Sequence, residues 1–228
     1  MDFRKQAELW LEKATDDIDI TDELKSIMDD EELLKEHFYC NLSFGTAGLR
    51  GVIGAGTNRM NIYTVRKATQ GLADYINKNF DKKSVAIAHD SRIKARLFSE
   101  EAARVLAANG IKVYITNELQ PTPVLSYLVR EFGCSAGIMI TASHNPAKYN
   151  GYKCYGSDGC QLTDEGAQKV YNEIEKLDIF TDIKICDYDK ALADGTIEIV
   201  SDELYDRYTS RVLERQVNPG VCEGSDLK

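Results

Sequence analysis

The sequence predicts an α/β protein, namely a three-layer α/β/α sandwich with a mixed, mostly parallel sheet and an N-terminal helical extension. Two observations lead to this prediction. From residue 61 to residue 215, short apolar runs alternate with amphipathic segments, which is the pattern of strand–helix units. Before that, residues 3–38 place apolar residues at near-helical spacing among many acids, which favours helices packed on the body.

Each element of the sandwich is predicted from local periodicity and punctuation. Gly110 and Gly133 follow two helical segments and suit C-terminal caps. Residues 156–159 have the composition of a turn. The expected helices span residues 61–79, 96–109, 121–132, 163–177 and 202–215, and the expected strands span 84–88, 111–115, 137–140 and 196–200.

Residues 44–59 do not follow either periodicity. They contain five glycines and two arginines, which indicates a functional loop or an irregular strand. We therefore divide the chain into a helical extension at 1–40, an α/β/α domain at 41–205, and a helix and linker at 206–228. The linker composition after residue 217 suggests a connection to a second domain that this chain lacks.

Composition excludes several functional classes. The 228 residues are 43% hydrophobic and 29% charged, which is typical of a soluble globular protein. No apolar run is long enough to span a bilayer, and the N-terminus lacks the apolar core of a signal peptide. Six cysteines without CxxC spacing favour a reduced, cytoplasmic protein. The net charge of -9 disfavours a nucleic-acid partner but not a small anionic substrate.

The segment 141–146 is the most informative motif. The apolar run 137–140 leads directly into Thr-Ala-Ser-His-Asn-Pro, and Asn-Pro prevents further regular structure. The carboxyl end of a strand is where α/β proteins present reactive side chains. Ser143 is therefore a candidate nucleophile or phosphate carrier, although a hydrogen bond within an Asn-Pro turn would equally explain a serine here.

His144 is next to Ser143, but the sequence does not favour a hydrolase. Neighbouring residues of an extended chain point to opposite faces, so we expect the two side chains not to meet. The G-x-S-x-G elbow of hydrolases is also absent, because Thr141 and Asn145 stand where its glycines belong.

Phosphate chemistry is favoured by two further features. Lys153 follows Ser143 after a loop interrupted by Pro146 and Gly151, so it can return to the same cleft and exchange a proton or neutralise charge. The glycine–arginine segment 44–59 suits phosphate oxygens, although it is neither a Walker A loop nor G-x-G-x-x-G. A solvated lysine and a flexible turn are the alternative interpretations.

The remaining polar motif, residues 89–92, ends another predicted strand at the same edge. We expect Asp90 or Ser91 to cap the following helix and Arg92 to form an ion pair. No metal site is evident, because the three histidines lie in separate segments. A phosphorylated Ser143 could still offer an oxygen to Mg²⁺.

Together these motifs resemble those of the α-D-phosphohexomutases. Residues 141–146 followed by 150–153 resemble the phosphoserine loop of that family, and 44–51 resemble its N-terminal signature in the phosphoglucomutase/phosphomannomutase branch. Residues 90–92 also match. The motifs are long, correctly ordered and specific, and the resemblance covers roughly residues 40–205.

The resemblance implies a mutase that interconverts glucose 1-phosphate and glucose 6-phosphate, or mannose phosphates, through a phosphoserine and a bisphosphorylated sugar. It implies that Ser143 carries the phosphoryl group, Arg50 stabilises it in transfer, Lys153 is the general acid/base and His144 contacts phosphate or substrate. The other implied phosphate- or substrate-binding residues are Thr46, Gly48, Asn145 and Arg92. Mg²⁺ would be held by phosphorylated Ser143 and by aspartates outside this chain, with glucose 1,6-bisphosphate as activator.

The extent of the chain departs from the family pattern. The family has four domains, and motifs of domains II to IV do not occur before Lys228. We expect a first domain that is inactive alone. The alternatives are a phosphopentomutase or sugar-bisphosphate synthase domain, which would share the serine loop, and a non-catalytic sugar-phosphate binding module.

Overall fold

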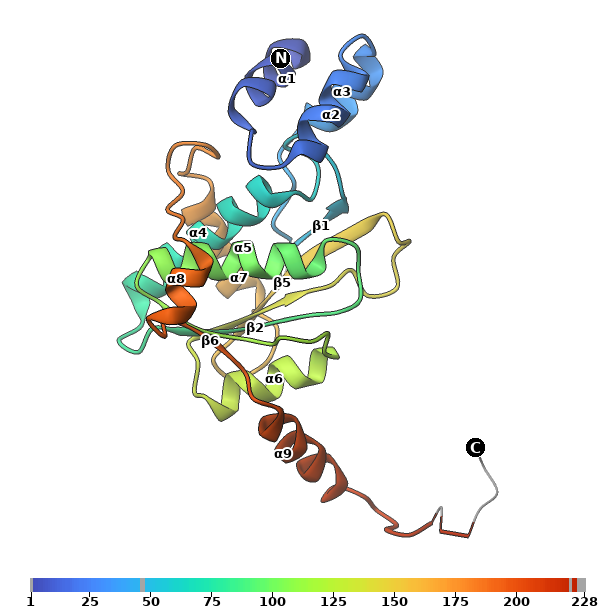
Figure 1. Ribbon diagram of the computed structural model, residues 1–228, viewed down its shortest axis with the longest axis vertical. Coiled ribbons are helices and arrows are strands. Elements are labelled where there is room, and N and C mark those ends of the chain that lie inside the picture. Colours follow the sequence, from blue (N-terminus) through green and yellow to red (C-terminus); the bar gives the residue numbers. More distant parts are fainter. Residues whose placement is uncertain (1, 46–47, 222, 225–228) are drawn as a thin grey trace.

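The computed structural model describes residues 2–45, 48–221 and 223–224. These residues form one sheet between two layers of helices, with further helices at one end (Figure 1). The strands are β1 (Gly48–Val52), β2 (Ser84–His89), β3 (Lys112–Ile115), β4 (Ala136–Ile140), β5 (Tyr149–Gly156) and β6 (Ile197–Ile199).

The sheet is mixed and mostly parallel, as predicted. Its strand order is β1-β5-β4-β2-β3-β6. The strands β4, β2, β3 and β6 are parallel neighbours, whereas β5 is antiparallel to both β4 and β1. The carboxyl ends of β2, β3, β4 and β6 therefore share one edge, which is where α/β proteins usually bind their ligands.

Helices cover both faces of this sheet. Two apolar cores result, because successive residues of a strand point to opposite faces. The described helices are α1 (Phe3–Lys13), α2 (Ile18–Ile27), α3 (Glu31–Phe38), α4 (Ile62–Asn79), α5 (Ala95–Ala108), α6 (Thr122–Glu131), α7 (Asp164–Ile174), α8 (Tyr188–Ala193) and α9 (Asp202–Leu213). Ile87 and Ile140 belong to the larger core, which packs against α4, α5, α7 and α8, whereas Ala88 and Met139 belong to the smaller core, which packs against α6 and α9 (Figure 1).

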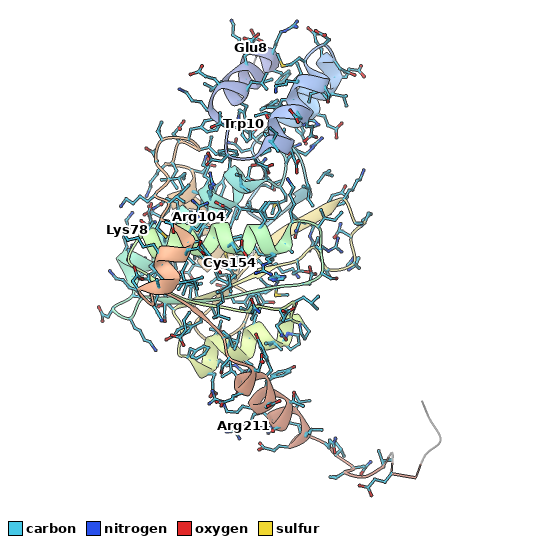
Figure 2. All side chains as sticks on the ribbon, in the orientation of Figure 1. Glu8, Trp10, Lys78, Arg104, Cys154 and Arg211 are labelled. Carbon is cyan, nitrogen blue, oxygen red and sulfur yellow. The ribbon has the colours of Figure 1, made fainter. Side chains whose placement is uncertain are left out.

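The predicted N-terminal extension consists of α1, α2 and α3. Buried Trp10 contacts Phe38 within the extension and joins the extension to the body through Tyr63 and Phe180. All three contacts are edge-to-face, a geometry that aromatic pairs prefer. Figure 2 shows Trp10 at the body end of α1, remote from Cys154 in the sheet. The extension and α9 lie at opposite ends of the long axis (Figure 1). The boundaries at 40/41 and 205/206 stay predictions.

Two elements differ from the sequence-based expectation. The segment after Pro146, expected to be a loop, contains β5. Part of the glycine-rich segment is β1, paired with β5, which agrees with the irregular strand that was one of the two expectations for that segment. Glycine permits this pairing, because a Cβ on Gly48 would lie 1.7 Å from the carbonyl oxygen of Tyr152. Short α8, at 188–193, was not predicted either.

The expected cap of α5 is also wrong. Neither Asp90 nor Ser91 caps this helix, because its N-cap residue is Lys94, which has a left-handed backbone (φ 58°) and no side-chain capping bond. The ammonium group of Lys94 instead contacts Asp17 at 3.0 Å and Asp19 at 2.7 Å. The start of α2 thereby holds the segment that carries Arg92.

Candidate active site

Ser143 lies in a tight loop directly beyond β4. Its backbone is left-handed, with φ 56°, a conformation that costs a non-glycine residue about 1–2 kcal/mol. The amide of Ser143 donates to Oγ1 of Thr141 at 2.9 Å, and the amide of Asn145 donates to the carbonyl of Ala142 at 3.1 Å. These bonds turn the chain sharply and leave the Ser143 side chain exposed.

Asp90 fixes the first residue of that loop. Its Oδ2 accepts a hydrogen bond from Oγ1 of Thr141 at 2.5 Å, and its Oδ1 accepts one from the amide of Arg92 at 3.1 Å. The carboxylate of Asp90 therefore joins the ends of β2 and β4. Sequence analysis missed this role of Asp90 and Thr141, because it appears only when the two strand ends are placed side by side.

Arg92 holds the rest of the loop through its backbone. Its guanidinium donates to the carbonyl oxygens of Ser143 (2.5 Å), Asn145 (2.8 Å), Pro146 (3.0 Å) and Tyr149 (3.1 Å). The expected ion pair is present but long, with Nε 3.9 Å from Asp90 Oδ2. Arg92 therefore positions the loop, and its implied phosphate-binding role stays a prediction.

His144 is closer to Ser143 than the sequence suggested. Its Nδ1 lies 3.3 Å from the Ser143 hydroxyl, so the expectation that the two side chains do not meet is wrong. The reason is the left-handed backbone at Ser143, because the argument from opposite faces holds only for an extended chain. In the described part of the structure, no carboxylate bonds to His144, so a catalytic triad is not formed there.

Arg50 and Lys153 bring positive charge to the same edge. Arg50 is paired with Gly151 across β1 and β5, and Lys153 is two residues further along β5, so both side chains lie on one face of the sheet. Lys153 is also opposite Met139, which places it on the α6 side. The described residues give neither Arg50 nor Lys153 an ion pair.

The environment of Lys153 favours its neutral form. Burial lowers the pKa of its ammonium group, and the charge of Arg50 lowers it further, whereas Asp90 acts in the opposite direction. A lysine with a lowered pKa can exchange protons near neutrality more readily than a solvated one.

The glycines of the site allow main-chain segments to lie close together. A Cβ on Gly151 would lie 2.6 Å from the carbonyl oxygen of Thr141, so Gly151 permits the close approach of β5 to the serine loop. Gly48 does the same between β1 and β5. Asn145 is partly buried, and its Oδ1 lacks a hydrogen-bond partner among the described residues. Thr46 lies outside the described residues, so its predicted role is untested.

The second half of the glycine–arginine segment has a structural role. Nη2 of buried Arg59 contacts Glu36 at 2.6 Å, and the amide of Ala55 donates to Glu23 at 2.7 Å. A Cβ on Gly56 would lie 2.5 Å from the carbonyl oxygen of His37. Residues 54–59 therefore dock on α2 and α3, which corrects the interpretation of the whole segment as a phosphate loop.

The described residues contain no cluster of three or more metal-ligating side chains. Within the same residues, five cysteines are free thiols. None of the described helices combines the length and the hydrophobicity needed to cross a membrane. What the site offers is an exposed serine, a neighbouring imidazole and two cationic side chains at one edge of the sheet.

Comparison with known proteins places the chain in one family. Residues 41–179 match the family model of phosphoglucomutase/phosphomannomutase, alpha/beta/alpha domain I. The chain is 40% identical over 204 residues to a phosphoglucomutase of Staphylococcus saprophyticus, covering 90% of this chain and 36% of that protein. It is 41% identical over 170 residues to a phosphoglucomutase of Staphylococcus aureus strain USA300, covering 75% of this chain and 30% of that protein.

Solved structures share the fold. A putative phosphomannomutase from Thermus thermophilus superimposes with a TM-score of 0.59 at 25% identity, over 76% of this chain and 36% of that chain. Parafusin, a phosphoglucomutase from Paramecium, shares the fold with a TM-score of 0.58 at 20% identity, over 76% of this chain and 35% of that chain. The chain thus spans about a third of the length of the relatives it matches. It belongs to the phosphoglucomutase/phosphomannomutase family, and its α/β/α sandwich is domain I of that family.

Proposed function

We propose that Ser143 carries a phosphoryl group and exchanges it with a hexose phosphate, in a mutase that interconverts glucose 1-phosphate and glucose 6-phosphate. The observation that carries this proposal is the loop geometry. The backbone of residues 143–149 is held by Arg92, while the hydroxyl of Ser143 stays exposed beside the edge that carries Arg50 and Lys153.

In the proposed first step, a hydroxyl oxygen of the sugar phosphate attacks the phosphorus on Ser143. The bond from phosphorus to Oγ breaks, and a sugar bisphosphate and free Ser143 result. Lys153 in its neutral form accepts the proton of the attacking hydroxyl, a role that its lowered pKa supports. His144, 3.3 Å from Oγ, donates a proton to the departing serine oxygen.

The second step reverses the first with the other phosphate of the sugar. The bisphosphate reorients so that its other phosphate faces Ser143. Oγ of Ser143 then attacks that phosphorus, the bond from phosphorus to the sugar oxygen breaks, and the isomeric monophosphate leaves. Arg50 stabilises the negative charge of the phosphoryl group in both transfers, because phosphoryl transfer depends mainly on positioning and on positive charge. Asn145, Gly48 and Thr46 are proposed to contact substrate or phosphate, with Arg92 as a positioning residue.

Mg²⁺ does not fit a site made by this chain alone. The described residues offer no cluster of carboxylates for it, and Mg²⁺ takes several oxygen ligands in near-octahedral geometry. A phosphoryl group on Ser143 would supply one oxygen. We therefore propose that the other ligands come from further domains, and we derive no step from the metal.

Further domains are also needed to recognise the sugar and its second phosphate, since the chain spans about a third of its relatives. We propose that this chain acts as the first of several domains and that glucose 1,6-bisphosphate activates the whole protein by phosphorylating Ser143. The free thiols support a reduced, cytoplasmic location.

Intact-mass spectrometry tests the proposal. We expect the protein that includes the further domains to gain one phosphoryl group, mapped to Ser143, after incubation with glucose 1,6-bisphosphate and Mg²⁺. The 228-residue chain alone is expected to turn over glucose 1-phosphate negligibly. An unchanged mass with measurable binding of the bisphosphate would instead show a non-catalytic binding module.

A further inference from the structure

The turn between α1 and α2 is fastened to the α/β/α domain by polar side chains. Oδ2 of Asp16 lies 2.6 Å from Nη1 of Arg66 on α4, and the amide of Asp16 donates to the hydroxyl of Tyr63 at 2.9 Å. Arg66 is buried and also bonds to buried Glu101 on α5, with Nε 2.5 Å from Oε2. The turn and the start of α2 therefore have a fixed place relative to α4 and α5.

Asp17 and Asp19, at the start of α2, bind Lys94, which precedes α5. The ammonium nitrogen of Lys94 lies 3.0 Å from Oδ2 of Asp17 and 2.7 Å from Oδ2 of Asp19. Oδ1 of Asp17 accepts the amide of Asp19 at 3.1 Å as the N-cap of α2. Both oxygens of Asp17 are engaged and its side chain is 11% exposed, so Asp17 is a fixed acceptor and not a solvated surface charge.

The ammonium group of Lys94 is held charged in a partly buried place. Burial by itself lowers the pKa of Lys94, but the hydrogen bonds to Asp19 and Asp17 raise this pKa above its ordinary value. The same contact lowers the pKa of Asp19. Exposed ion pairs contribute little because water screens them, whereas this one is sheltered on the Lys94 and Asp17 sides. It can therefore hold the segment before α5.

The backbone of Lys94 needs such a restraint. Its φ of 58° lies in the left-handed region, which residues other than glycine rarely adopt. No side chain caps the start of α5 in the described structure. Lys94 and Ser143 are the two non-glycine residues with a positive φ among those that the structure describes. Strained backbone of this kind is often concentrated at functional sites.

Arg92 connects the two strained residues. It lies two positions before Lys94, and its guanidinium holds the carbonyl oxygens of the serine loop. Nδ2 of Asn150 on β5 also donates to the carbonyl oxygen of Ile93 at 2.9 Å. The segment 91–94 and the serine loop thus hold each other. Among the hydrogen bonds and ion pairs of the described residues, those from α2 to Lys94 restrain this pair from another part of the molecule.

We propose that α2 is a positioning element for phosphoryl transfer: Asp17 and Asp19 hold Lys94, so that Arg92 keeps the serine loop in its reactive shape. This inference rests on the proposed function of Ser143. It gives the helical extension a role in the rate of the reaction and not only in stability. Because transfer depends on how exactly the reacting groups are aligned, loss of this restraint should affect the rate more than the affinity for substrate.

A double variant of α2 tests the proposal in the protein that includes the further domains. Asp17→Asn/Asp19→Asn removes both charges and keeps an N-cap, because asparagine caps a helix as well as aspartate does. We expect phosphoryl incorporation at Ser143 from glucose 1,6-bisphosphate to slow about fivefold, with the concentration for half-maximal rate unchanged. Asp22→Asn is the matched control, because Asp22 pairs with Lys25 on the same helix. Equal rates in the double variant and the control would overturn the proposal.

Variants at Lys94 separate positioning from stability. Lys94→Gly loses both ion pairs but relieves the left-handed strain, so its urea midpoint should stay close to that of the unchanged protein while incorporation slows about fivefold. Lys94→Arg keeps the charge and should restore most of the rate. Asp16→Asn weakens the same turn but leaves Lys94 paired, so it should lower the urea midpoint and keep the full rate. A fast Lys94→Gly variant or a slow Asp16→Asn variant would overturn the proposal.

A measurement without phosphorylation distinguishes failure of this inference from failure of the proposed function. Nitrogen-15 NMR of the 228-residue chain reports the shape of the serine loop through the amides of Ser143 and Asn145, which both donate within that loop. Their resonances should shift in the Asp17→Asn/Asp19→Asn variant and not in Asp22→Asn. Shifts without any phosphorylation would support the link from α2 to the loop and contradict the proposed function. Unchanged resonances would overturn the inference itself.

Discussion

The serine loop (residues 141–149) and the glycine loop (residues 54–59) are held in contrasting ways. Both are irregular segments after a strand, and each depends on one arginine. Arg92 binds carbonyl oxygens of the serine loop and leaves its side chains free. Arg59 belongs to the glycine loop itself, and its side chain is buried against Glu36. The comparison shows that a loop keeps its side chains available for chemistry when the hydrogen bonds that hold it go to its main chain.

Removing the serine hydroxyl should produce the largest difference between the two loops. Ser143→Ala is expected to abolish phosphoryl incorporation, because no other described group replaces Oγ at this position. Folding should be nearly unaffected, since the side chain is exposed. The measurement is intact mass after incubation of the longest natural form with glucose 1,6-bisphosphate. Ser157→Ala, in an exposed turn, is the matched control, and phosphorylation of the Ser143→Ala variant would refute the assignment.

A methyl group at Gly48 should break the strand pair that carries Arg50. The added Cβ would meet main-chain atoms of Tyr152 and Lys153, which cannot move aside independently. We expect Gly48→Ala to lower the free energy of unfolding by about 4 kcal/mol, measured by urea denaturation. Gly195→Ala is the control. It also has positive φ, but nothing lies within 4 Å of the new Cβ, so the loss should be about 1 kcal/mol. Equal losses would show that strand contact is unimportant.

Exchanging each arginine for methionine compares the two loops directly. Arg92→Met and Arg59→Met should each lower the free energy of unfolding by about 2 kcal/mol, because each arginine loses several hydrogen bonds to partly buried acceptors. Only Arg92→Met should also slow phosphoryl incorporation at Ser143, by about tenfold or more, because misplacing a reacting group weakens transfer. Equal phosphorylation rates in the two variants would remove the positioning role of Arg92.

The smallest effect is expected from the pH dependence of Lys153. The pKa of Lys153 is lower in the folded protein than in the unfolded chain, where it is near 10.5. At a pH between these two pKa values, the unfolded chain therefore binds more protons than the folded protein does. Stability therefore rises with pH through this window. Lys153→Met should be more stable than the unchanged protein by a few tenths of a kcal/mol at pH 7, since screening by solvent keeps the effect small.

That advantage should disappear as the pH approaches 10.5, where the unfolded lysine also loses its proton. Urea denaturation at pH 7 and pH 10 measures the difference. Lys67→Met is a suitable comparison, because no salt bridge to a described residue holds Lys67. A gain for Lys153→Met that did not shrink with pH would show that packing, and not charge burial, causes it.

Much of the sandwich follows from sequence because its elements are long or strongly periodic. The helix predicted at 61–79 is α4 (Ile62–Asn79), with a capping box between Asn61 and Thr64. Strand β5 escaped prediction because buried residues on both faces hide its alternation, and Pro146 and Gly151 suggested a loop. Short α8 has only six residues, too few for a clear helical period.

The site was less predictable than the fold. Ser143 and Lys153 could be selected because their motifs are specific. The contact of Ser143 with His144 could not be predicted. It depends on the left-handed backbone of one residue, which no local sequence pattern indicates. The separate roles of Arg50, Arg59 and Arg92 depend on which carbonyls and carboxylates the fold brings near, and sequence gives all three the same guanidinium.

The hydrogen bonds of Arg92 to the serine loop affect how that loop can evolve. All four acceptors of the guanidinium are main-chain oxygens, which every amino acid possesses. Side chains at positions 144, 145 and 147 can therefore be exchanged while the arginine keeps its partners. A lineage, or a protein engineer, can thus vary the side chains around the serine by single substitutions while the loop keeps its shape.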